Sequence, residues 1–268
     1  MSDRDGGLSR RCLLGAAGAA LVTIACGGPG MTDGRSGALQ GPDEERGRKG
    51  LLRERPRPPV AGGGAPGLQA LGLGGDRDGL MFVPSGYDED HPLPLVVMLH
   101  GAGGNATGGL APFHDRADEA GLILLAPESR GRTWDVILGG YGSDEDFIDR
   151  ALAQAFDRYA VDPERVTVEG FSDGASYALG LGLTNGDLFR RIVALSPGYA
   201  PSARQKGHPK VFVSHGTSDD VLPIERCSRR IVPALQRDGY DVRYREFDGG
   251  HEVPVRIVDE VLGWLGLP

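Results

Sequence analysis

From about residue 66 onward, short segments rich in apolar residues alternate with longer amphipathic segments. The short segments are typical of buried strands and lie at 79–84, 93–101, 122–127, 165–170, 191–196, 210–215 and 241–247. The longer segments repeat apolar residues at helical spacing, which predicts helices at 109–120, 144–160, from about 174, 223–238 and 253–265. Strands separated by helices imply parallel pairing through right-handed crossovers. The pattern therefore predicts an α/β fold, a mostly parallel sheet with helices on both faces.

The beginning of the chain has a different pattern. Three arginines, Arg4, Arg10 and Arg11, precede a charge-free stretch at 12–25 that is too short to span a bilayer and is typical of a signal-peptide core. The segment around Arg10 and Arg11 resembles a twin-arginine export signal. We therefore expect residues 1–26 to direct export, and the product to be a cell-surface lipoprotein or a secreted or periplasmic protein.

The segment Thr23-Ile24-Ala25-Cys26 resembles a bacterial lipobox, which would make Cys26 an acylated residue and a membrane tether. Thr23 stands where leucine is usual in that motif. Ordinary cleavage near Ala25, which would release a secreted product, is therefore the alternative. The sequence leaves both open.

Residues 27–65 contain 11 glycines and 5 prolines, with charges of both signs and few large apolar residues. Such a composition cannot bury enough apolar surface to fold by itself. We expect a flexible, disordered tether at 27–65, followed by one catalytic domain at 66–268.

Charge is distributed unevenly along the 268 residues. The net charge is −8, to which residues 1–65 contribute +3 and residues 66–268 contribute −11. An acidic globular part argues against nucleic acid or an anionic membrane face as the main partner. Three cysteines and six histidines exclude a cysteine-rich zinc or disulfide framework.

Candidate chemistry follows the strand at 165–170. Gly170-Phe171-Ser172-Asp173-Gly174 is a G-x-S-x-G segment between a predicted strand and a predicted helix. In that context the serine sits on a sharp turn that lifts its hydroxyl above the sheet, and the two glycines leave room where strand and helix backbones nearly touch. Ser172 is therefore the candidate nucleophile. The alternative is an ordinary turn flanked by glycines.

A glycine-rich loop, His100-Gly101-Ala102-Gly103-Gly104, follows the strand at 93–101. Its backbone can turn N–H groups toward the site, and we expect the N–H groups of Ala102 and Asp173 to form an oxyanion hole. His100 is expected to orient this loop and not to react. The alternative is a loop that only reverses the chain.

A candidate acid and a candidate base follow two later strands. Asp219 is preferred to Asp220 because its position fits the pattern HG-x-x-D-x-x-x-P. His251 follows two glycines at the end of the strand at 241–247 and is the candidate base. The order Ser172, Asp219, His251 is the chain order of α/β-hydrolases.

These segments together resemble the α/β-hydrolase superfamily over roughly 79–268. Within it they resemble small bacterial phospholipase/carboxylesterases and polyhydroxybutyrate depolymerase-like esterases, through LVVMLHGAGG, APESRGRTWD, VEGFSDGASYALGLG, VFVSHGTSDDVLP and GGHEVP. The resemblance implies an α/β-hydrolase fold with an eight-stranded sheet. The short connection at 196–210 implies no large lid domain and an open site. Dienelactone hydrolases carry cysteine where Ser172 stands, which sets them aside.

The resemblance implies a serine carboxylesterase that forms an acyl-enzyme on Ser172 and needs no metal or cofactor, and the signal pattern at 1–26 predicts that it is exported. We expect Trp134, which follows a strand, to shape the substrate pocket; its alternative role is packing. The substrate would be a small-molecule or polymeric ester.

Other functions stay open: a polyester depolymerase or feruloyl-type esterase acting on polymers, a peptidase, and a catalytically silent binding protein on the same fold. Acyl length, leaving group and oligomeric state are not determined.

Overall fold

The computed structural model describes residues 50–60, 64–201 and 205–268, all within one compact unit, Pro42–Pro268. The predicted export signal at 1–26, Cys26 and the tether up to residue 49 lie outside the described residues. None of the helices in the described part is long and apolar enough to cross a membrane.

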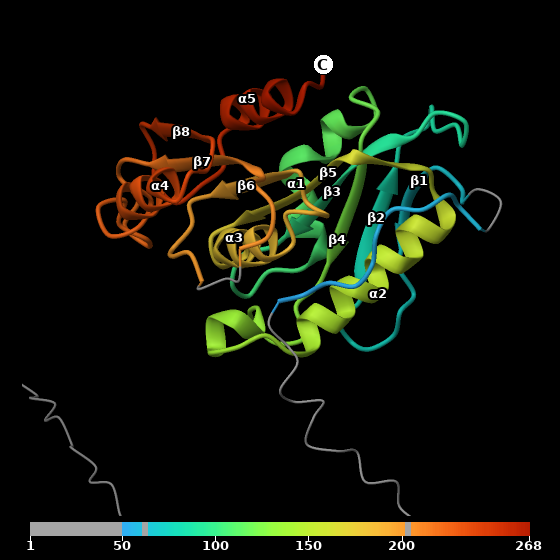
Figure 1. Cartoon of the computed structure of the whole chain (residues 1–268), viewed down its shortest axis with the longest axis horizontal. Helices are drawn as coiled ribbons and strands as arrows, with labels where there is room; N and C mark the ends of the chain where they lie inside the picture. Colours follow the sequence, from blue (N-terminus) through green and yellow to red (C-terminus); the bar gives the residue numbers. More distant parts are fainter. Residues whose placement is uncertain (1–49, 61–63, 202–204) are drawn as a thin grey trace, which may run out of the picture. The chain divides into compact units, whose positions relative to one another are not determined.

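A single eight-stranded sheet forms the centre of the unit, with strand order β1-β2-β4-β3-β5-β6-β7-β8 (Figure 1). Pairing is antiparallel for β1 with β2 and for β2 with β4, and parallel elsewhere. The strands are β1 (Gly67–Ala70), β2 (Gly79–Val83), β3 (Leu93–Leu99), β4 (Ile123–Pro127), β5 (Val161–Phe171), β6 (Arg191–Leu195), β7 (Lys210–Gly216) and β8 (Val242–Phe247). All seven strands predicted from the sequence are present. The eighth, β1, lacked a clear signal because it is a short edge strand with every second residue exposed.

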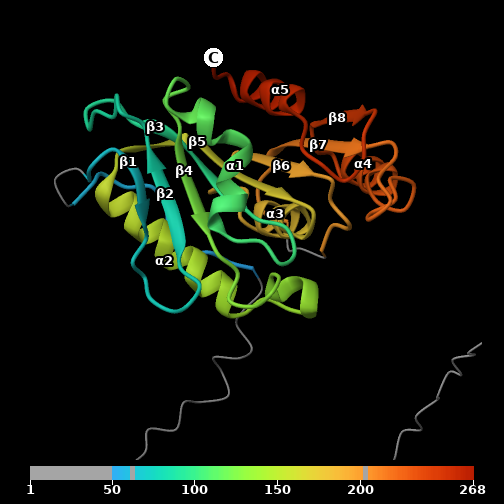
Figure 2. The ribbon, with the colours of Figure 1, turned by 180° about the vertical axis from the view of Figure 1, so that it is seen from behind.

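Two layers of helices cover the sheet (Figure 1, Figure 2). The helices are α1 (Ala106–Ala117), η1 (Asp135–Leu138, a 3-10 helix), α2 (Ser143–Arg158), α3 (Asp173–Thr184), α4 (Ser228–Arg237) and α5 (Val255–Leu265). Apolar residues of α2, α3 and α4 share one core cluster, and those of α1 and α5 share the other. Helices on both faces of a mostly parallel sheet confirm the predicted α/β architecture.

Two helices begin three or more residues from their predicted starts. α1 begins three residues early because the Asn105 side chain accepts a hydrogen bond from the N–H of Gly108 at 2.9 Å and caps a start that the glycines conceal. α4 begins only at Ser228, because residues 223–227 form turns closed by hydrogen bonds such as Arg226 N–H to the Pro223 carbonyl at 2.9 Å. The connection at 196–209 holds no helix or strand in its described residues, as expected for a fold without a large lid domain.

Residues 50–60 pack against the domain, so the prediction of a free tether reaching residue 65 is wrong for this segment. Leu52 is 4% exposed and belongs to the α2–α3 core cluster. Its N–H donates to Asn185 Oδ1 at 2.9 Å, while Asn185 Nδ2 donates to the Gly50 carbonyl at 2.6 Å. Arg55 forms an ion pair with Asp187 at 2.8 Å. One buried leucine and a set of backbone hydrogen bonds order a segment whose average composition resembles a linker.

We expect Leu52→Ala to lower the free energy of unfolding of the full chain by about 2 kcal/mol, because it opens a cavity under a segment that partly collapses into it. Leu51→Ala is the matched control, since Leu51 is 40% exposed. Urea unfolding of both variants measures the difference. Equal stability of the two variants would contradict the packing of this segment.

Candidate active site

Ser172 sits on a strained turn between β5 and α3. Its backbone has φ of 59° and ψ of −120°, in a region that residues with a side chain rarely adopt. Its N–H donates to the Leu195 carbonyl of the neighbouring strand β6 at 2.9 Å, which helps to hold the turn. This backbone conformation directs the side chain of Ser172 away from the path that the chain takes from β5 to α3. The residue is 8% exposed.

Gly170 and Gly174 make that turn sterically possible. A Cβ atom on Gly170 would lie 2.2 Å from the Gly174 carbonyl oxygen, and one on Gly174 would lie 2.0 Å from the Leu99 carbonyl oxygen of β3. Both distances are far below any van der Waals contact. The close backbone approach predicted from the G-x-S-x-G segment is therefore confirmed.

Ser172, His251 and Asp219 form one hydrogen-bonded chain. His251 Nε2 lies 2.9 Å from Ser172 Oγ, and His251 Nδ1 lies 2.7 Å from Asp219 Oδ2. The ring of His251 rests against Phe171, with ring centroids 4.7 Å apart. Since an ionised Asp219 only accepts, Nδ1 of His251 carries the proton and Nε2 is free to accept the serine proton.

Asp219 is held as an ionised acceptor. Its Oδ1 accepts the N–H groups of Val221 at 3.0 Å and Leu222 at 2.8 Å. Burial acts to raise the pKa of Asp219, but the hydrogen bonds from the Leu222 amide and from His251 outweigh it, and the pKa is lowered. Asp220 is exposed and has none of these contacts. The structure thus brings Asp219, and not Asp220, to the histidine.

The glycine-rich loop lies beside Ser172. A Cβ atom on Gly101 would lie 3.4 Å from Ser172 Cβ, and Gly103 N–H donates to the Arg132 carbonyl at 2.7 Å. Within the described residues, the backbone N–H groups of Ala102 and Asp173 have no acceptor in the chain. Two free N–H groups on the segments that flank the hydroxyl are what binding of an oxyanion requires.

His100 supports this loop in the manner expected of it. Its Nε2 accepts the N–H of Ser129 at 3.1 Å, and its Nδ1 lies 2.7 Å from the Gly101 carbonyl oxygen. The Nδ1–H therefore donates to that carbonyl. Burial lowers the pKa of His100, which favours this neutral form. His100 is 2% exposed and orients the loop through these two hydrogen bonds.

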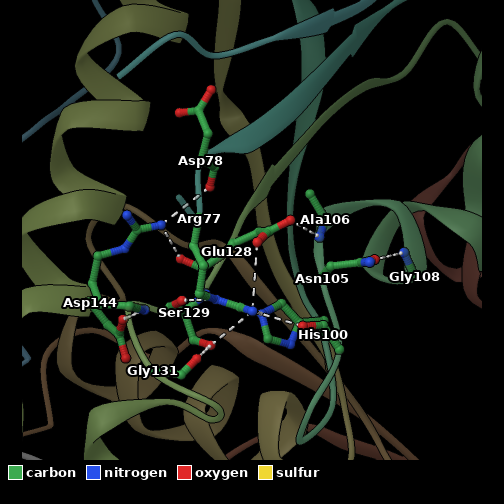
Figure 3. Close-up of polar contacts among 12 residues, drawn as sticks. Arg77, Asp78, His100, Asn105, Ala106, Gly108, Glu128, Ser129, Gly131 and Asp144 are labelled. Atoms are coloured by element: carbon green, nitrogen blue, oxygen red, sulfur yellow. Dashed lines mark hydrogen bonds and ion pairs between the residues drawn. The ribbon is translucent and has the colours of Figure 1, made fainter. Parts of the chain in front are cut away.

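Arg77 also holds the loop, and the sequence offered no signal for it. Arg77 Nη2 donates to the Gly104 carbonyl at 2.7 Å, and Arg77 Nε donates to the Ser129 carbonyl at 2.5 Å (Figure 3). Glu128 lies 3.7 Å from the Arg77 guanidinium and accepts the N–H of Ala106 at the start of α1. Arg77 comes from the loop before β2, remote in sequence from the residues it fixes, so only the fold reveals its role.

Asp144 anchors the loop that follows β4. It accepts the N–H of Arg130 and, at 2.7 Å, the N–H of Asp135 (Figure 3 shows the first contact). In return Asp144 N–H donates to Asp135 Oδ2 at 3.0 Å. The Thr133 hydroxyl in this loop donates to Asp173 Oδ2 at 2.7 Å and so connects the loop to the start of α3.

Trp134 is a core residue, and the prediction that it shapes the substrate pocket is wrong. Its side chain is 0% exposed, and its indole N–H donates to the His100 carbonyl at 2.8 Å. It stacks on Tyr177 of α3, with centroids 5.2 Å apart. An aromatic residue after a strand end can turn inward as readily as outward, and here a buried carbonyl provides the partner for its N–H.

Three exposed apolar side chains, Leu138, Tyr199 and Val221, lie on segments next to the site. They are 76%, 41% and 61% exposed. Val221 donates its N–H to Asp219. Tyr199 donates its N–H to Ser176 Oγ on the first turn of α3 at 3.3 Å, and its hydroxyl donates to the Val136 carbonyl of η1 at 3.2 Å. We call these three residues the apolar rim.

Other candidate chemistry is limited. In the part of the chain that the structure describes, no group of three or more His, Cys, Asp or Glu side chains is arranged to hold a metal ion. Cys227 is 5% exposed, and burial raises the pKa of its thiol.

Comparisons with known proteins agree with the fold. Residues 137–266 match the model of the phospholipase/carboxylesterase family. A probable feruloyl esterase C of Aspergillus oryzae is 28% identical over 158 residues, which are 56% of this chain and 57% of that protein. An acetylxylan esterase of Coprinopsis cinerea is 31% identical over 187 residues, 53% of this chain and 50% of that protein. The chain thus spans about half the length of the curated relatives it matches.

Among solved structures, esterase PE8 is similar with a TM-score of 0.59 and 25% identity, over 70% of this chain and 97% of that one. The sheet, the strained serine turn and these likenesses together define the class. The chain has the α/β-hydrolase fold, and the relatives and solved structure to which it is similar are esterases.

We expect Gly174→Ala to disrupt the serine turn, because the added methyl group would collide with the β3 backbone. The free energy of unfolding should fall by several kcal/mol. Gly263→Ala is the matched control: a Cβ there meets no atom within 4 Å in helix α5, and alanine is favoured over glycine by roughly 0.5–1 kcal/mol inside a helix. The midpoint temperatures of thermal unfolding of the two variants should therefore shift in opposite directions from that of the native chain. A shift in the same direction would contradict the steric argument.

Proposed function

We propose that this protein is a serine carboxylesterase that hydrolyses carboxylic esters through an acyl-enzyme on Ser172. The observation that carries the proposal is the hydrogen-bonded chain from Ser172 through His251 to Asp219, next to the free N–H groups of Ala102 and Asp173. The likeness to esterases supports it. The intact chain of three residues argues against a catalytically silent binding protein.

In the first half of the reaction, Ser172 Oγ attacks the acyl carbonyl carbon while His251 Nε2 takes the hydroxyl proton. The carbonyl oxygen becomes an oxyanion, which the N–H groups of Ala102 and Asp173 bind. The positive end of the α3 helix dipole stabilises the same charge. His251 then gives its proton to the departing alcohol oxygen, and the ester bond breaks.

In the second half, water attacks the acyl-enzyme while His251 again acts as the base, and the acid leaves as Ser172 regains its proton. Asp219 stays ionised and stabilises the His251 cation in both halves. Its lowered pKa, in which the Leu222 and His251 hydrogen bonds outweigh burial, keeps it charged at neutral pH.

For the substrate we propose esters of small or medium acyl groups, with feruloyl-type or other polymeric esters as the alternative. The apolar rim, whose segments are hydrogen-bonded to Asp219 and to the first turn of α3, offers exposed hydrophobic contact area for an acyl or alcohol group. The names of the matched relatives, feruloyl esterase and acetylxylan esterase, favour including feruloyl esters and acetylated xylan among the substrates tested.

We also propose that the protein is exported through residues 1–26 and that Cys26 carries a lipid anchor. The positive start, the charge-free stretch and the lipobox-like segment support this proposal.

We expect Ser172→Ala to reduce kcat by at least 10³-fold, since it removes the nucleophile, and Asp219→Asn to reduce it by about 10⁴-fold. Asp220→Asn is the matched control and should keep native activity. The assay uses p-nitrophenyl esters of increasing chain length, with feruloyl esters and solid polyesters beside them. Retained activity in Ser172→Ala would rule out the nucleophile, and no ester hydrolysis by the folded native chain would rule out the function.

We expect Cys26→Ser to move the protein from the membrane fraction to the soluble exported fraction of a bacterial host, because it removes the only sulfur of the lipobox-like segment. Fractionation followed by immunoblotting measures this. Thr23→Leu is the comparison variant and should strengthen anchoring, because leucine is usual at that position. Unchanged partitioning of Cys26→Ser would contradict lipidation.

A further inference from the structure

A second histidine, His215, lies behind the acid. It stands near the end of β7 and is 0% exposed. His215 Nε2 lies 3.2 Å from Asp219 Oδ2 and 2.7 Å from the Leu222 carbonyl oxygen. His215 Nδ1 lies 2.7 Å from Ser228 Oγ at the start of α4. The reaction described above assigns no role to this residue.

These contacts determine which ring nitrogen of His215 carries the proton. The Leu222 carbonyl can only accept, so Nε2 carries a hydrogen and donates it. Burial lowers the pKa of His215, and the ring is neutral at pH 7. Nδ1 therefore accepts a hydrogen bond from the Ser228 hydroxyl, which fixes this tautomer.

Asp219 Oδ2 consequently faces two histidine N–H groups. His251 Nδ1–H donates at 2.7 Å. The His215 Nε2–H is shared between the Leu222 carbonyl, at 2.7 Å from Nε2, and Asp219 Oδ2, at 3.2 Å from Nε2, and so is a weaker second donor. Together with the two amides on Oδ1, the carboxylate has four N–H groups around it. Its rotation is therefore determined from both sides.

The other charged and titratable groups near His215 are few. Glu246 of β8 pairs in register with His215 and is bonded to Arg229 of α4 at 2.6 Å. Cys227 precedes Ser228 on the same side, and its raised thiol pKa, caused by burial, keeps it neutral. The interaction of His215 with Asp219 is thus the direct polar contact that connects it to the catalytic chain.

We propose that His215 is a positioning residue: as a neutral second donor to Asp219 Oδ2, it fixes the carboxylate toward His251 and limits how strongly that carboxylate stabilises the His251 cation. The proposal rests on the esterase function proposed above. A second donor on the same oxygen reduces the negative charge that the Asp219 carboxylate presents to His251. Loss of this donor makes Asp219 more basic and raises the pKa of His251.

Two variants of the full chain separate the donor from the packing. His215→Gln places an amide N–H near the position of Nε2, and His215→Asn reaches only the position of Nδ1, so it keeps a partner for Ser228 and loses the donor to Asp219. We expect His215→Asn to raise the acidic pKa of the kcat/KM profile by about half a unit and to lower kcat about tenfold with KM unchanged. His215→Gln should restore most of both.

Titration of His251 by ¹⁵N NMR measures the same shift without any substrate. Ser228→Ala supplies a second route, because it removes the hydroxyl that fixes the His215 tautomer; we expect a smaller rise in the His251 pKa. Thermal unfolding of each variant shows whether it is folded.

An unchanged His251 titration in folded His215→Asn, or in Ser228→Ala if the first variant does not fold, overturns the proposal and leaves His215 a packing residue. Equal shifts in His215→Asn and His215→Gln overturn it too. If the native chain hydrolyses no ester while the NMR shift appears, the proposed function fails and the hydrogen-bond assignment stands. If the native chain hydrolyses esters and the NMR shift is absent, the proposed function stands and the role of His215 fails.

Discussion

The close approach of three backbones under Ser172 is the constraint on which the site depends. The start of α3 comes so near to the end of β3 that a Cβ on Gly174 would lie 2.0 Å from a carbonyl oxygen. This approach places the strained serine at the carboxyl edge of the sheet, where the loops after β3, β7 and β8 begin. The strain at φ of 59° is held because β6 accepts the serine N–H on one side and the helix begins on the other.

Around that turn, the polar scaffold is built from neutral histidines and backbone groups. His100 orients the glycine-rich loop through one backbone donor and one backbone acceptor. His215 accepts from the Ser228 hydroxyl and donates to the Leu222 carbonyl beside Asp219. Burial lowers the pKa of both rings, so neither adds a positive charge next to the reacting groups. In the reaction that we propose, a preorganised site of this kind needs little rearrangement when charge develops on the oxyanion.

Much of the fold was readable from local patterns. All seven predicted strands and all five predicted helices are present. Their patterns are local, because a run of apolar residues marks a buried strand and apolar residues at helical spacing mark a helix packed on the sheet. β1 and the segment at 50–60 were missed for one reason: each is short, and each is ordered by partners distant in sequence. Leu52 meets Asn185 across the fold, and no window of local composition contains that contact.

The sequence alone determined which serine, acid and histidine the fold brings into one hydrogen-bonded chain. A serine between two glycines at a strand-to-helix turn, and an acid and a histidine after later strands, are local patterns with few other uses. Only the tertiary structure decided what surrounds them. In the folded protein Trp134 is buried in the core, Arg77 is hydrogen-bonded to the glycine-rich loop, and His215 contacts Asp219. These outcomes depend on which way a side chain points and which remote atom it meets, and such facts exist only once the sheet has brought its strand ends together.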